Sequence, residues 1–395
     1  MAFQQGLSGL NAASRNLDVI GHNIANANTV GMKSSRAEFA ELYASSVGAS
    51  GGISQGIGVS IATVSQAFTQ GNLTITGRDM DVAINGNGFF AMSMPDGSLQ
   101  YSRDGQFKLD RDGRILNNQG GQLMGYPTDV EGKRTAFDPI ALSLPTGGPI
   151  PANATSEITA EFNLDARAVV GADPVGTYGT SVLVYDAQGR EYPIALTFQK
   201  VNNNEWSVSA QGPDGVAQAL PNMTFDGTGA LTSAPQSGPV NVTTPDGTVI
   251  PVNLNLDNVT QFASPFSVTN LTQDGYPPGE LTSLQIEDNG VIMARYSNGE
   301  SQAAGQIQLV NFRNAQGLAP VGGNGWVATF ASGAPIPGAP GEGNMGMLKA
   351  GAVEDSNVDL TAELVNMMTA QRAYQANAQT IKTQDQVMST LLNMR

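Results

Sequence analysis

The chain of 395 residues contains no cysteine and a single histidine, His22. Without cysteine it can form no disulfide, no thiolate nucleophile and no cysteine-ligated zinc or iron–sulfur centre. With one histidine it has no multi-histidine metal site, and the commonest general base of enzymes has a single candidate. The composition therefore excludes several large classes of enzyme and metalloprotein, and we expect no metal and no cofactor.

Charged residues are also scarce, at 13% of the chain, and aromatic residues make up only 6%. The 34 acidic residues outnumber the 19 basic ones, which gives a formal net charge of −15. An acidic balance without long basic runs argues against a nucleic-acid partner and against binding to anionic lipid surfaces. No run of about 18 apolar residues occurs, so we expect no membrane insertion.

The amino terminus reads MAFQQGLSGLNAASRN. It lacks the basic region, apolar core and small-residue cleavage site of a secretory signal peptide. The absence of a signal usually indicates a cytoplasmic protein, although proteins exported by a route without a cleaved signal also lack one.

Apolar residues recur at heptad spacing near both ends of the chain, which predicts two coiled-coil-like helices, over about 3–24 and 358–393. Ser356, with Asp359 three residues later, predicts a capping box at the start of the second helix. Glycines weaken the first helix by roughly 1 kcal/mol each relative to alanine, so it needs a partner. We therefore expect the two ends to pack together or into neighbouring subunits. The predicted assembly-interface residues are Leu7, Leu10, Leu17, Ile24, Leu364, Met367, Tyr374, Ile381, Met388 and Leu392.

Between the two helices the sequence predicts β structure with tight turns. Asp96-Gly97, Asp104-Gly105 and Asp112-Gly113 lie eight residues apart, and Asp-Gly tolerates the positive φ of hairpin turns. We interpret this spacing as a β-meander. A second set of strands and turns is predicted over 281–312.

Composition divides the β-rich middle further, because about 144–278 is richer in proline, threonine and asparagine and is bounded by proline-rich segments. The predicted fold class is α+β and mostly β, with long terminal α-helices that pack in coiled-coil fashion and nested, discontinuous β-rich domains. The predicted domains are a terminal helical domain with its linker (1–70 plus 351–395), an inner β domain (71–144 plus 279–350) and an inserted outer β domain (145–278).

Catalytic motifs are scarce. Asp110-Arg111-Asp112-Gly113 resembles the start of a calcium loop, but the later ligands are missing and a hairpin turn is favoured. The glycine-rich pieces lack the Gly-Lys-Ser/Thr of a P-loop, and no G-x-S-x-G elbow occurs. His22 has no Ser–Asp arrangement near it in sequence, so we interpret it as a packing or interface residue. We expect no catalytic residues and no enzymatic activity.

Three segments carry a resemblance to a known family. LNAASRNLDVIGHNIANANTVGMK resembles the amino-terminal signature of the bacterial flagellar rod and hook axial proteins. GNLTITGRDMDVAINGNGFFAM, followed by YSRDGQFKLDRDGRILNNQGGQLMGYP, resembles the shared β segment of that family. NVDLTAELVNMMTAQRAYQANAQTIKTQDQVMSTLLNMR resembles its carboxyl-terminal helix. Together these segments cover about the first 125 and the last 40 residues.

Within this family the large insertion over about 144–278 is similar to the outer domain of the hook branch. The resemblance implies a structural subunit that self-assembles into a curved tubular polymer, a universal joint that passes motor torque from rod to filament. It also implies export without a cleaved signal peptide to an extracellular location on the flagellum. The implied partners are further copies of the chain, the distal rod protein, the hook cap protein, the hook–filament junction protein and the flagellar type III export apparatus.

Two alternatives stay open at this point. The shorter distal rod protein is the alternative within the family. A secreted β-rich carbohydrate-binding protein or glycosidase is the alternative from another class. The low aromatic content disfavours sugar stacking.

Overall fold

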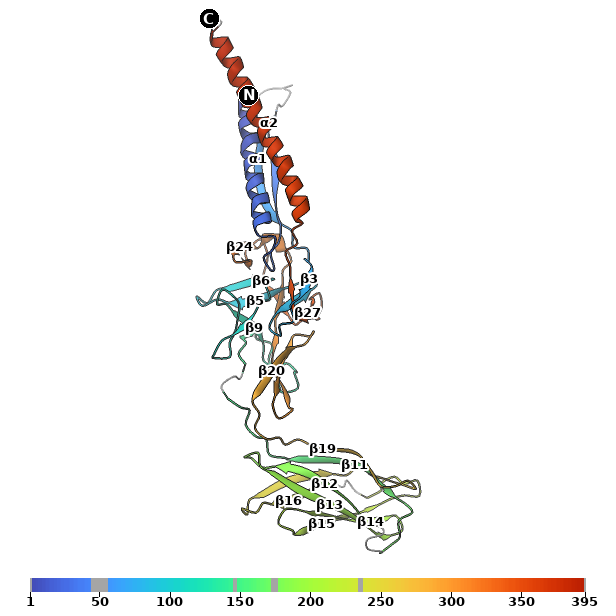
Figure 1. Cartoon of the computed structure of the whole chain (residues 1–395). Helices are drawn as coiled ribbons and strands as arrows, with labels where there is room; N and C mark the ends of the chain where they lie inside the picture. The colour runs from blue at the N-terminus through green and yellow to red at the C-terminus, as the bar shows by residue number, and fades with distance from the viewer. Residues whose placement is uncertain (1, 44–55, 145–147, 172–176, 234–236, 394–395) are drawn as a thin grey trace. The chain divides into compact units, whose positions relative to one another are not determined.

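The computed structural model describes residues 2–43, 56–144, 148–171, 177–233 and 237–393 (Figure 1). The chain divides into two compact units, each with its own core. The three-domain division expected from composition stays a prediction, and part of its proline-rich boundary (145–147) lies outside the described residues. Unit 1 comprises Met1–Gly147, Leu284–Ala294 and Gln302–Arg395, and unit 2 comprises Gly148–Ser283 and Arg295–Ser301.

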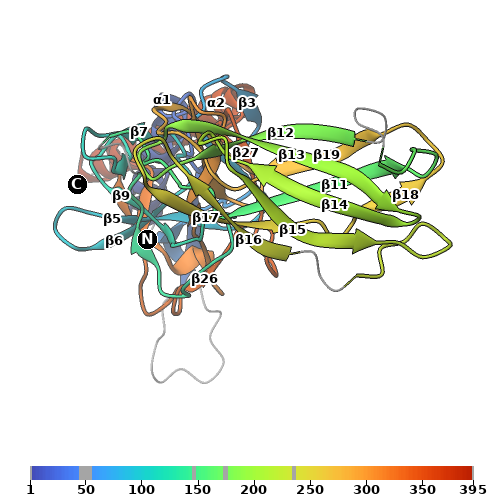
Figure 2. The same cartoon turned by 90° about the horizontal axis from the view of Figure 1, so that it is seen from below.

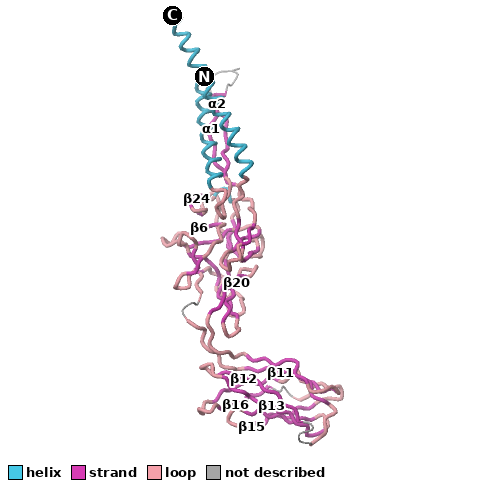
Figure 3. Tube along the Cα trace, in the orientation of Figure 1, coloured by secondary structure: helices cyan, strands magenta, loops and turns pink. Residues whose placement is uncertain are grey.

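The two predicted terminal helices are present in unit 1 and lie side by side, as the cyan segments of Figure 3 show. Helix α1 spans Ala2–Ala25 and helix α2 spans Leu360–Asn393. An antiparallel hairpin of β1 (Ser35–Tyr43) and β2 (Gly56–Gln66) packs along α1. The expectation that the chain ends pack together, within a mostly β fold, is confirmed. Neither helix has the length and apolar character needed to cross a bilayer over the part of the chain that the structure describes.

The start of α2 differs from the predicted capping box. Asp359 Oδ1 accepts hydrogen bonds from the backbone N–H groups of Thr361 and Ala362, at 2.8 and 3.2 Å. The Ser356 hydroxyl accepts only from the N–H of Val358. Because the helix begins at Leu360, Asp359 occupies the N-cap position and Ser356 lies outside the helix. The capping-box prediction was therefore wrong, and Asp359 caps the helix by itself.

One large sheet forms most of the β part of unit 1, with the strand order β20-β21-β22-β9-β5-β6-β25-β24 and five shorter strands paired beside this path. The β20–β21–β22 meander confirms the second predicted set of strands. The strands are β5 (Phe89–Ser93), β6 (Leu99–Ser102), β7 (Lys108–Leu109), β8 (Ile115–Leu116), β9 (Gln122–Tyr126), β10 (Ile140–Ala141), β20 (Leu281–Ile286), β21 (Val291–Tyr296), β22 (Ser301–Ile307), β23 (Leu309–Asn311), β24 (Ala319–Gly322), β25 (Gly325–Val327) and β26 (Ile336–Gly338), with a 3₁₀ turn at Ala315–Gly317.

Two small sheets join the carboxyl-terminal part of the chain to an early part. β27 (Met347–Ala350) pairs with β4 (Val82–Asn85), and β28 (Ala352–Glu354) pairs with β3 (Leu73–Ile75), both antiparallel. Leu348 on β27 is buried in the apolar cluster built around Ile84, Phe90 and Phe107. The core of unit 1 therefore includes residues from both ends of the chain.

The first predicted meander is only partly present. Asp96-Gly97 and Asp112-Gly113 lie at the β5–β6 and β7–β8 hairpins, as expected. Asp104-Gly105 does not close a hairpin, since β6 pairs with β5 and β25 and not with β7. Gly105 instead passes against the backbone of Val82, so closely that a Cβ atom on it would overlap the Val82 carbonyl oxygen. This glycine is needed for the close approach of two chain segments, so the meander prediction was wrong here.

Unit 2 consists of two sheets around one apolar core (Figure 2). The core includes Phe162 and Phe198, with ring centroids 4.4 Å apart, and the fully buried Trp206. The indole N–H of Trp206 donates to Gln261 Oε1 at 2.9 Å, so this buried donor is satisfied. The first sheet contains β11 (Glu157–Asp165), β16 (Ser237–Thr243), β17 (Val249–Asn255), β18 (Thr260–Phe262) and β19 (Ser267–Gln273), and the second contains β12 (Thr177–Tyr185), β13 (Glu191–Asn202), β14 (Glu205–Gln211) and β15 (Ala217–Thr224).

A pair of leucines on neighbouring strands tests the core of unit 2. Leu196 on β13 is 1% exposed, whereas Leu183 on β12 is 46% exposed. Leu196→Ala should lower the free energy of unfolding of unit 2 by roughly 3–5 kcal/mol, because it removes buried methyl groups and leaves a cavity. Leu183→Ala should change it by less than about 0.5 kcal/mol. Urea unfolding of the full chain measures both, and equal effects would contradict the observed orientation of this sheet.

Asp274 gives unit 2 a pH-dependent contribution to stability. Burial raises the pKa of its carboxyl, but hydrogen bonds from the Glu157 N–H and from the Ser156 hydroxyl and N–H outweigh burial, so the pKa lies below its usual value. A carboxyl with a lowered folded-state pKa stabilises the fold above its unfolded pKa of about 3.9, and this stabilisation is lost as pH falls further. In the unsubstituted chain the urea concentration at the unfolding midpoint should fall as pH drops below about 4. In Asp274→Asn it should fall less steeply, as urea titrations at several pH values would measure. An unchanged slope would argue against this role.

Candidate functional site

Helices α1 and α2 approach each other closely at two glycines of α1. A Cβ atom at Gly9 would lie 2.9 Å from the side-chain amide of Asn377, and one at Gly6 would lie 3.1 Å from Ile381 Cγ1. Larger residues at either position would force the helices apart or displace these side chains. The glycines that weaken α1 as an isolated helix are therefore what allow α2 to pack against it.

Further buried residues of the two helices are apolar, and one buried polar residue hydrogen-bonds across them. Ala13, Ile20 and Ala370 are buried in unit 1. Asn23, which is 1% exposed, donates to Glu363 Oε1 at 3.2 Å and exchanges two hydrogen bonds with the backbone of Ser35. This asparagine ties α1 to α2 and to β1 together, which the heptad pattern of apolar residues did not predict.

The predicted interface residues divide into two groups around this contact. Leu10, Leu17, Ile24, Met367 and Ile381 are half-buried, and Ile381 lies against Gly6. The others remain exposed in the single chain, apart from Leu392, whose side chain lies outside the described residues. The exposed fractions are 45% for Leu7, 51% for Leu364, 37% for Tyr374 and 59% for Met388. Whether any of these residues contacts a neighbouring subunit stays a prediction.

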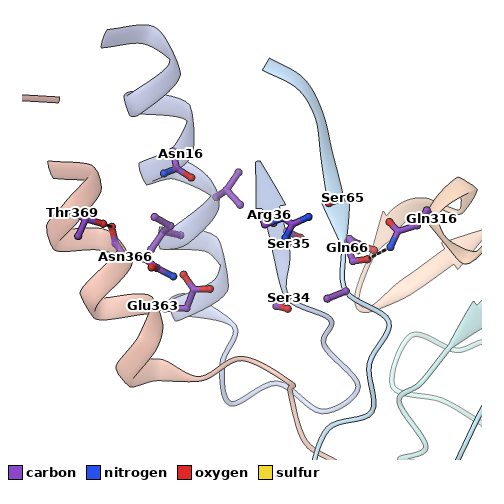
Figure 4. Close-up of a pocket in the computed structure, with 13 residues that line it drawn as sticks. Asn16, Ser34, Ser35, Arg36, Ser65, Gln66, Gln316, Glu363, Asn366 and Thr369 are labelled. Carbon is purple, nitrogen blue, oxygen red and sulfur yellow. Dashed lines mark hydrogen bonds between the residues drawn. The ribbon is translucent and has the colours of Figure 1, made fainter. Parts of the chain in front are cut away.

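A polar cleft of about 490 Å³ lies beside α1 where that helix passes β1, β2 and the start of α2 (Figure 4). Its lining is rich in amides and hydroxyls, including Asn16, Gln66 and Asn366. Glu363 supplies the one carboxylate of this lining, and its Oε2 is buried without a hydrogen-bond partner. The cleft therefore offers hydrogen-bond donors and acceptors from amides and hydroxyls beside one carboxylate.

The single histidine lies nearby but does not form a reactive site with the groups around it. His22 is exposed on α1, and its Nδ1 lies 3.3 Å from the side-chain nitrogen of Asn26. It is therefore not a core-packing residue, and an interface role stays a prediction. Over the described ranges of the chain no cluster of three or more His, Cys, Asp or Glu residues could hold a metal ion.

Three buried charges lie where the helical part of unit 1 meets its β part. Glu354 Oε1 lies 2.5 Å from Lys33 Nζ, and Glu354 Oε2 lies 3.0 Å from an Arg103 guanidinium nitrogen. Glu354 and Lys33 are fully buried, and Arg103 is 4% exposed. Burial lowers the pKa of Lys33 below its usual value, and the Glu354 carboxylate raises it in part. The sequence analysis missed this cluster because its members lie 251 and 321 residues apart.

Two glycines of α1 provide a matched test of the helix contact. Gly9→Leu should lower the unfolding free energy of the paired helices by roughly 1–3 kcal/mol, because the larger side chain overpacks the contact with Asn377. Gly21 has no atom within 4 Å of an added Cβ, so Gly21→Ala should instead stabilise α1 by about 1 kcal/mol. Amide hydrogen exchange of α1 and α2 in the full chain measures both changes. If both substitutions stabilised the helices, Gly9 would not lie as close to Asn377 as the structure shows.

Comparisons with known proteins extend over the whole chain. Family models match in four places: "Flagella basal body rod protein" at 3–33, "Flagellar hook protein FlgE/F/G D1 domain" at 83–161, "Flagellar basal body protein FlaE D2 domain" at 150–276 and "Flagellar basal body rod FlgEFG protein C-terminal" at 349–394.

Full-length relatives are named flagellar hook protein FlgE. The chain is 42% identical to the protein of Salmonella typhimurium, with both chains covered completely, and 41% identical to that of Escherichia coli, again over both full lengths. It is 34% identical to that of Borreliella burgdorferi, covering all of this chain and 99% of the relative. The crystal structure of the Helicobacter pylori flagellar hook protein FlgE2 matches with a TM-score of 0.56 at 14% identity, over 70% of this chain and 99% of that one. That last match shows similarity of fold.

Proposed function

This chain belongs to the flagellar hook protein family, and from that premise we propose that its paired terminal helices are the surface through which subunits join. Its role is that of a structural subunit of the bacterial flagellar hook. Neither the shorter distal rod protein nor a carbohydrate-binding protein or glycosidase is favoured, because the full-length relatives are hook proteins.

The observation that carries the proposal is the apolar surface left open on these helices. Water-exposed apolar side chains are individually common on proteins, but exposed apolar residues that recur at heptad spacing on one long helix mark an interaction surface. On α2 the exposed residues at the predicted heptad positions are Leu360, Leu364, Tyr374 and Met388, each at least 37% exposed.

A second copy of the chain is the occupant that this surface requires in a polymer. Head-to-tail contacts between different faces of identical subunits generate open helical assemblies when the rotation from one subunit to the next does not close a ring. The small residues on α1 are already used within the subunit, so the larger apolar residues on α2 and at Leu7 remain for its neighbours. The terminal helices would then form the continuous, well-packed contacts that give the tube its torsional stiffness.

Bending requires contacts that exchange at little cost in free energy. Unit 2 suits that requirement because several of its charges are paired locally at turns, as in Asp165–Arg167 and Asp186–Arg190. Weak polar contacts between such surfaces exchange readily with water. We propose that contacts between neighbouring copies of unit 2 slide while those of the terminal helices hold.

The remaining parts of the proposal concern location and partners. The hook lies on the bacterial flagellum, and we propose that the chain reaches the cell exterior through the flagellar type III export apparatus. Its proposed partners are the distal rod protein at one end, the hook cap protein during growth and the hook–filament junction protein at the other end. The hook family is structural, and we propose that the chain has no enzymatic activity.

Two adjacent residues of α2 test which face joins subunits. Leu364 and Val365 are 51% and 49% exposed, but they point about 100° apart around the helix. Leu364→Gln should raise the critical concentration for polymerisation about tenfold, because burial of a leucine side chain contributes roughly 1.5–3 kcal/mol. Val365→Gln should change it by less than about twofold if the predicted seam is the joining face. Sedimentation of assembled tubes measures both.

Glutamine keeps a good helix propensity at either site, so the comparison isolates the lost apolar contact. Equal effects of the two substitutions would place the joining face elsewhere on α2. Unchanged assembly in both variants would remove α2 as a joining surface.

A further inference from the structure

Residues 346–357 are here called the closing segment. We propose that they act as a folding latch, which means that unit 1 does not complete its folding until they pack in place. The reason is that this segment supplies Glu354 to the buried cations Lys33 and Arg103. The closing segment follows nearly all of the chain in sequence and precedes only α2. The inference concerns the folding of a single subunit and does not depend on how subunits join.

The electrostatic part of the latch is the pairing of two cations with one anion. Lys33 Nζ also donates to the Thr69 carbonyl oxygen at 2.8 Å, and Arg103 donates to the Gly86 carbonyl oxygen at 2.9 Å. Among the described residues Glu354 is the only carboxylate that forms an ion pair with either cation. Without it, two buried positive charges would face each other with no anion between them.

Burying an unpaired charge is strongly unfavourable, whereas leaving it in water is not. Before Glu354 arrives, the state of lowest free energy therefore keeps Lys33 and Arg103 hydrated. The chain segments that carry these two residues must then also remain exposed to water. Lys33 follows α1, and Arg103 follows β6 in the large sheet, where its guanidinium also lies over the Phe89 ring at 5.3 Å.

The closing segment supplies backbone contacts as well as the carboxylate. The Glu354 carbonyl oxygen accepts from the Gly31 N–H at 2.8 Å, and its Oε1 accepts from the Gly71 N–H at 2.9 Å. The Asn357 side chain accepts from the Ser34 N–H at 2.7 Å and donates to the Ala67 carbonyl oxygen at 2.7 Å. These bonds tie together two separate stretches of the early chain, and each requires the closing segment.

Two strands and part of the core arrive with the same segment. β27 is the only described partner of β4, and β28 is the only described partner of β3. Leu348 fills a position in the cluster that also holds Ile84 and Phe90. Without the closing segment, β3 and β4 would have unpaired edges and the core of unit 1 would lack one of its side chains.

The closing segment lies far along the chain from the two cations, so we expect it to pack late in folding. Lys33 precedes Glu354 by 321 residues and Arg103 precedes it by 251. A chain that becomes available from its amino terminus therefore exposes both cations long before their anion. Unit 2 lies entirely between residues 148 and 301 and has its own core, so it needs nothing from the closing segment. We expect unit 2 to fold first and unit 1 last.

Refolding of the full-length chain tests this order directly. The chain is diluted from denaturant, labelled by pulsed hydrogen exchange at increasing times and analysed by mass spectrometry of peptides. Peptides of β13 in unit 2 should become protected in an early phase. Peptides of β3, β4 and β5 should become protected together with those of β27 and β28. Protection of β4 and β5 before β27 would overturn the proposal.

The carboxylate is tested at equilibrium with one substitution and a matched control. Glu354→Gln removes the charge but keeps the shape, and amide protection across β3 to β6 should fall about a hundredfold or more while unit 2 is unchanged. Glu342→Gln makes the same change at an exposed carboxylate of unit 1 that pairs with Arg134, and protection should stay within about threefold. An open unit 1 beside a folded unit 2 in Glu354→Gln would support the latch. Unchanged protection of unit 1 would overturn it.

Discussion

The structure of unit 1 depends on one buried carboxylate that pairs with two buried cations from distant parts of the chain. Lys33 and Arg103 are buried, and among the residues that the structure describes Glu354 is the only carboxylate paired with either. Because a buried cation without an anion is so unfavourable, the early and late segments of the chain have to meet at this point. Once they have met, α1 and α2 start from neighbouring positions, and the helix contact follows from that placement.

The helix contact and the exposed surface of α2 use different kinds of residue for a physical reason. Gly6 and Gly9 let the backbones of the two helices approach closely, and large apolar side chains such as Leu364 and Met388 remain exposed. A single subunit thus satisfies its own packing with small residues. Its larger residues remain for contacts that form only in an assembly, and these contacts contribute more free energy per residue because more apolar area is buried.

Because unit 2 is inserted into the sequence of unit 1, the two units need different parts of the chain in order to fold. Unit 2 is a continuous insertion apart from residues 295–301, and its core around Phe162, Phe198 and Trp206 is formed entirely from that insertion. Unit 1 needs the two ends of the chain at once. The same arrangement keeps both termini in the unit that carries the proposed joining surface, while the insertion can vary without disturbing the buried charges.

The sequence by itself determined the local features of this protein. Heptad spacing located both terminal helices to within two residues, Asp-Gly pairs located two hairpin turns, and the terminal segments indicated the family, since each of these signals is carried by residues close together in the chain. Tertiary structure decided everything that depends on distant residues: the close approach of Gly105 to Val82, the small-residue contact between α1 and α2, and the pairing of Glu354 with Lys33 and Arg103. No local pattern can predict such contacts, because their energy arises only when segments that are not neighbours in the sequence are buried together.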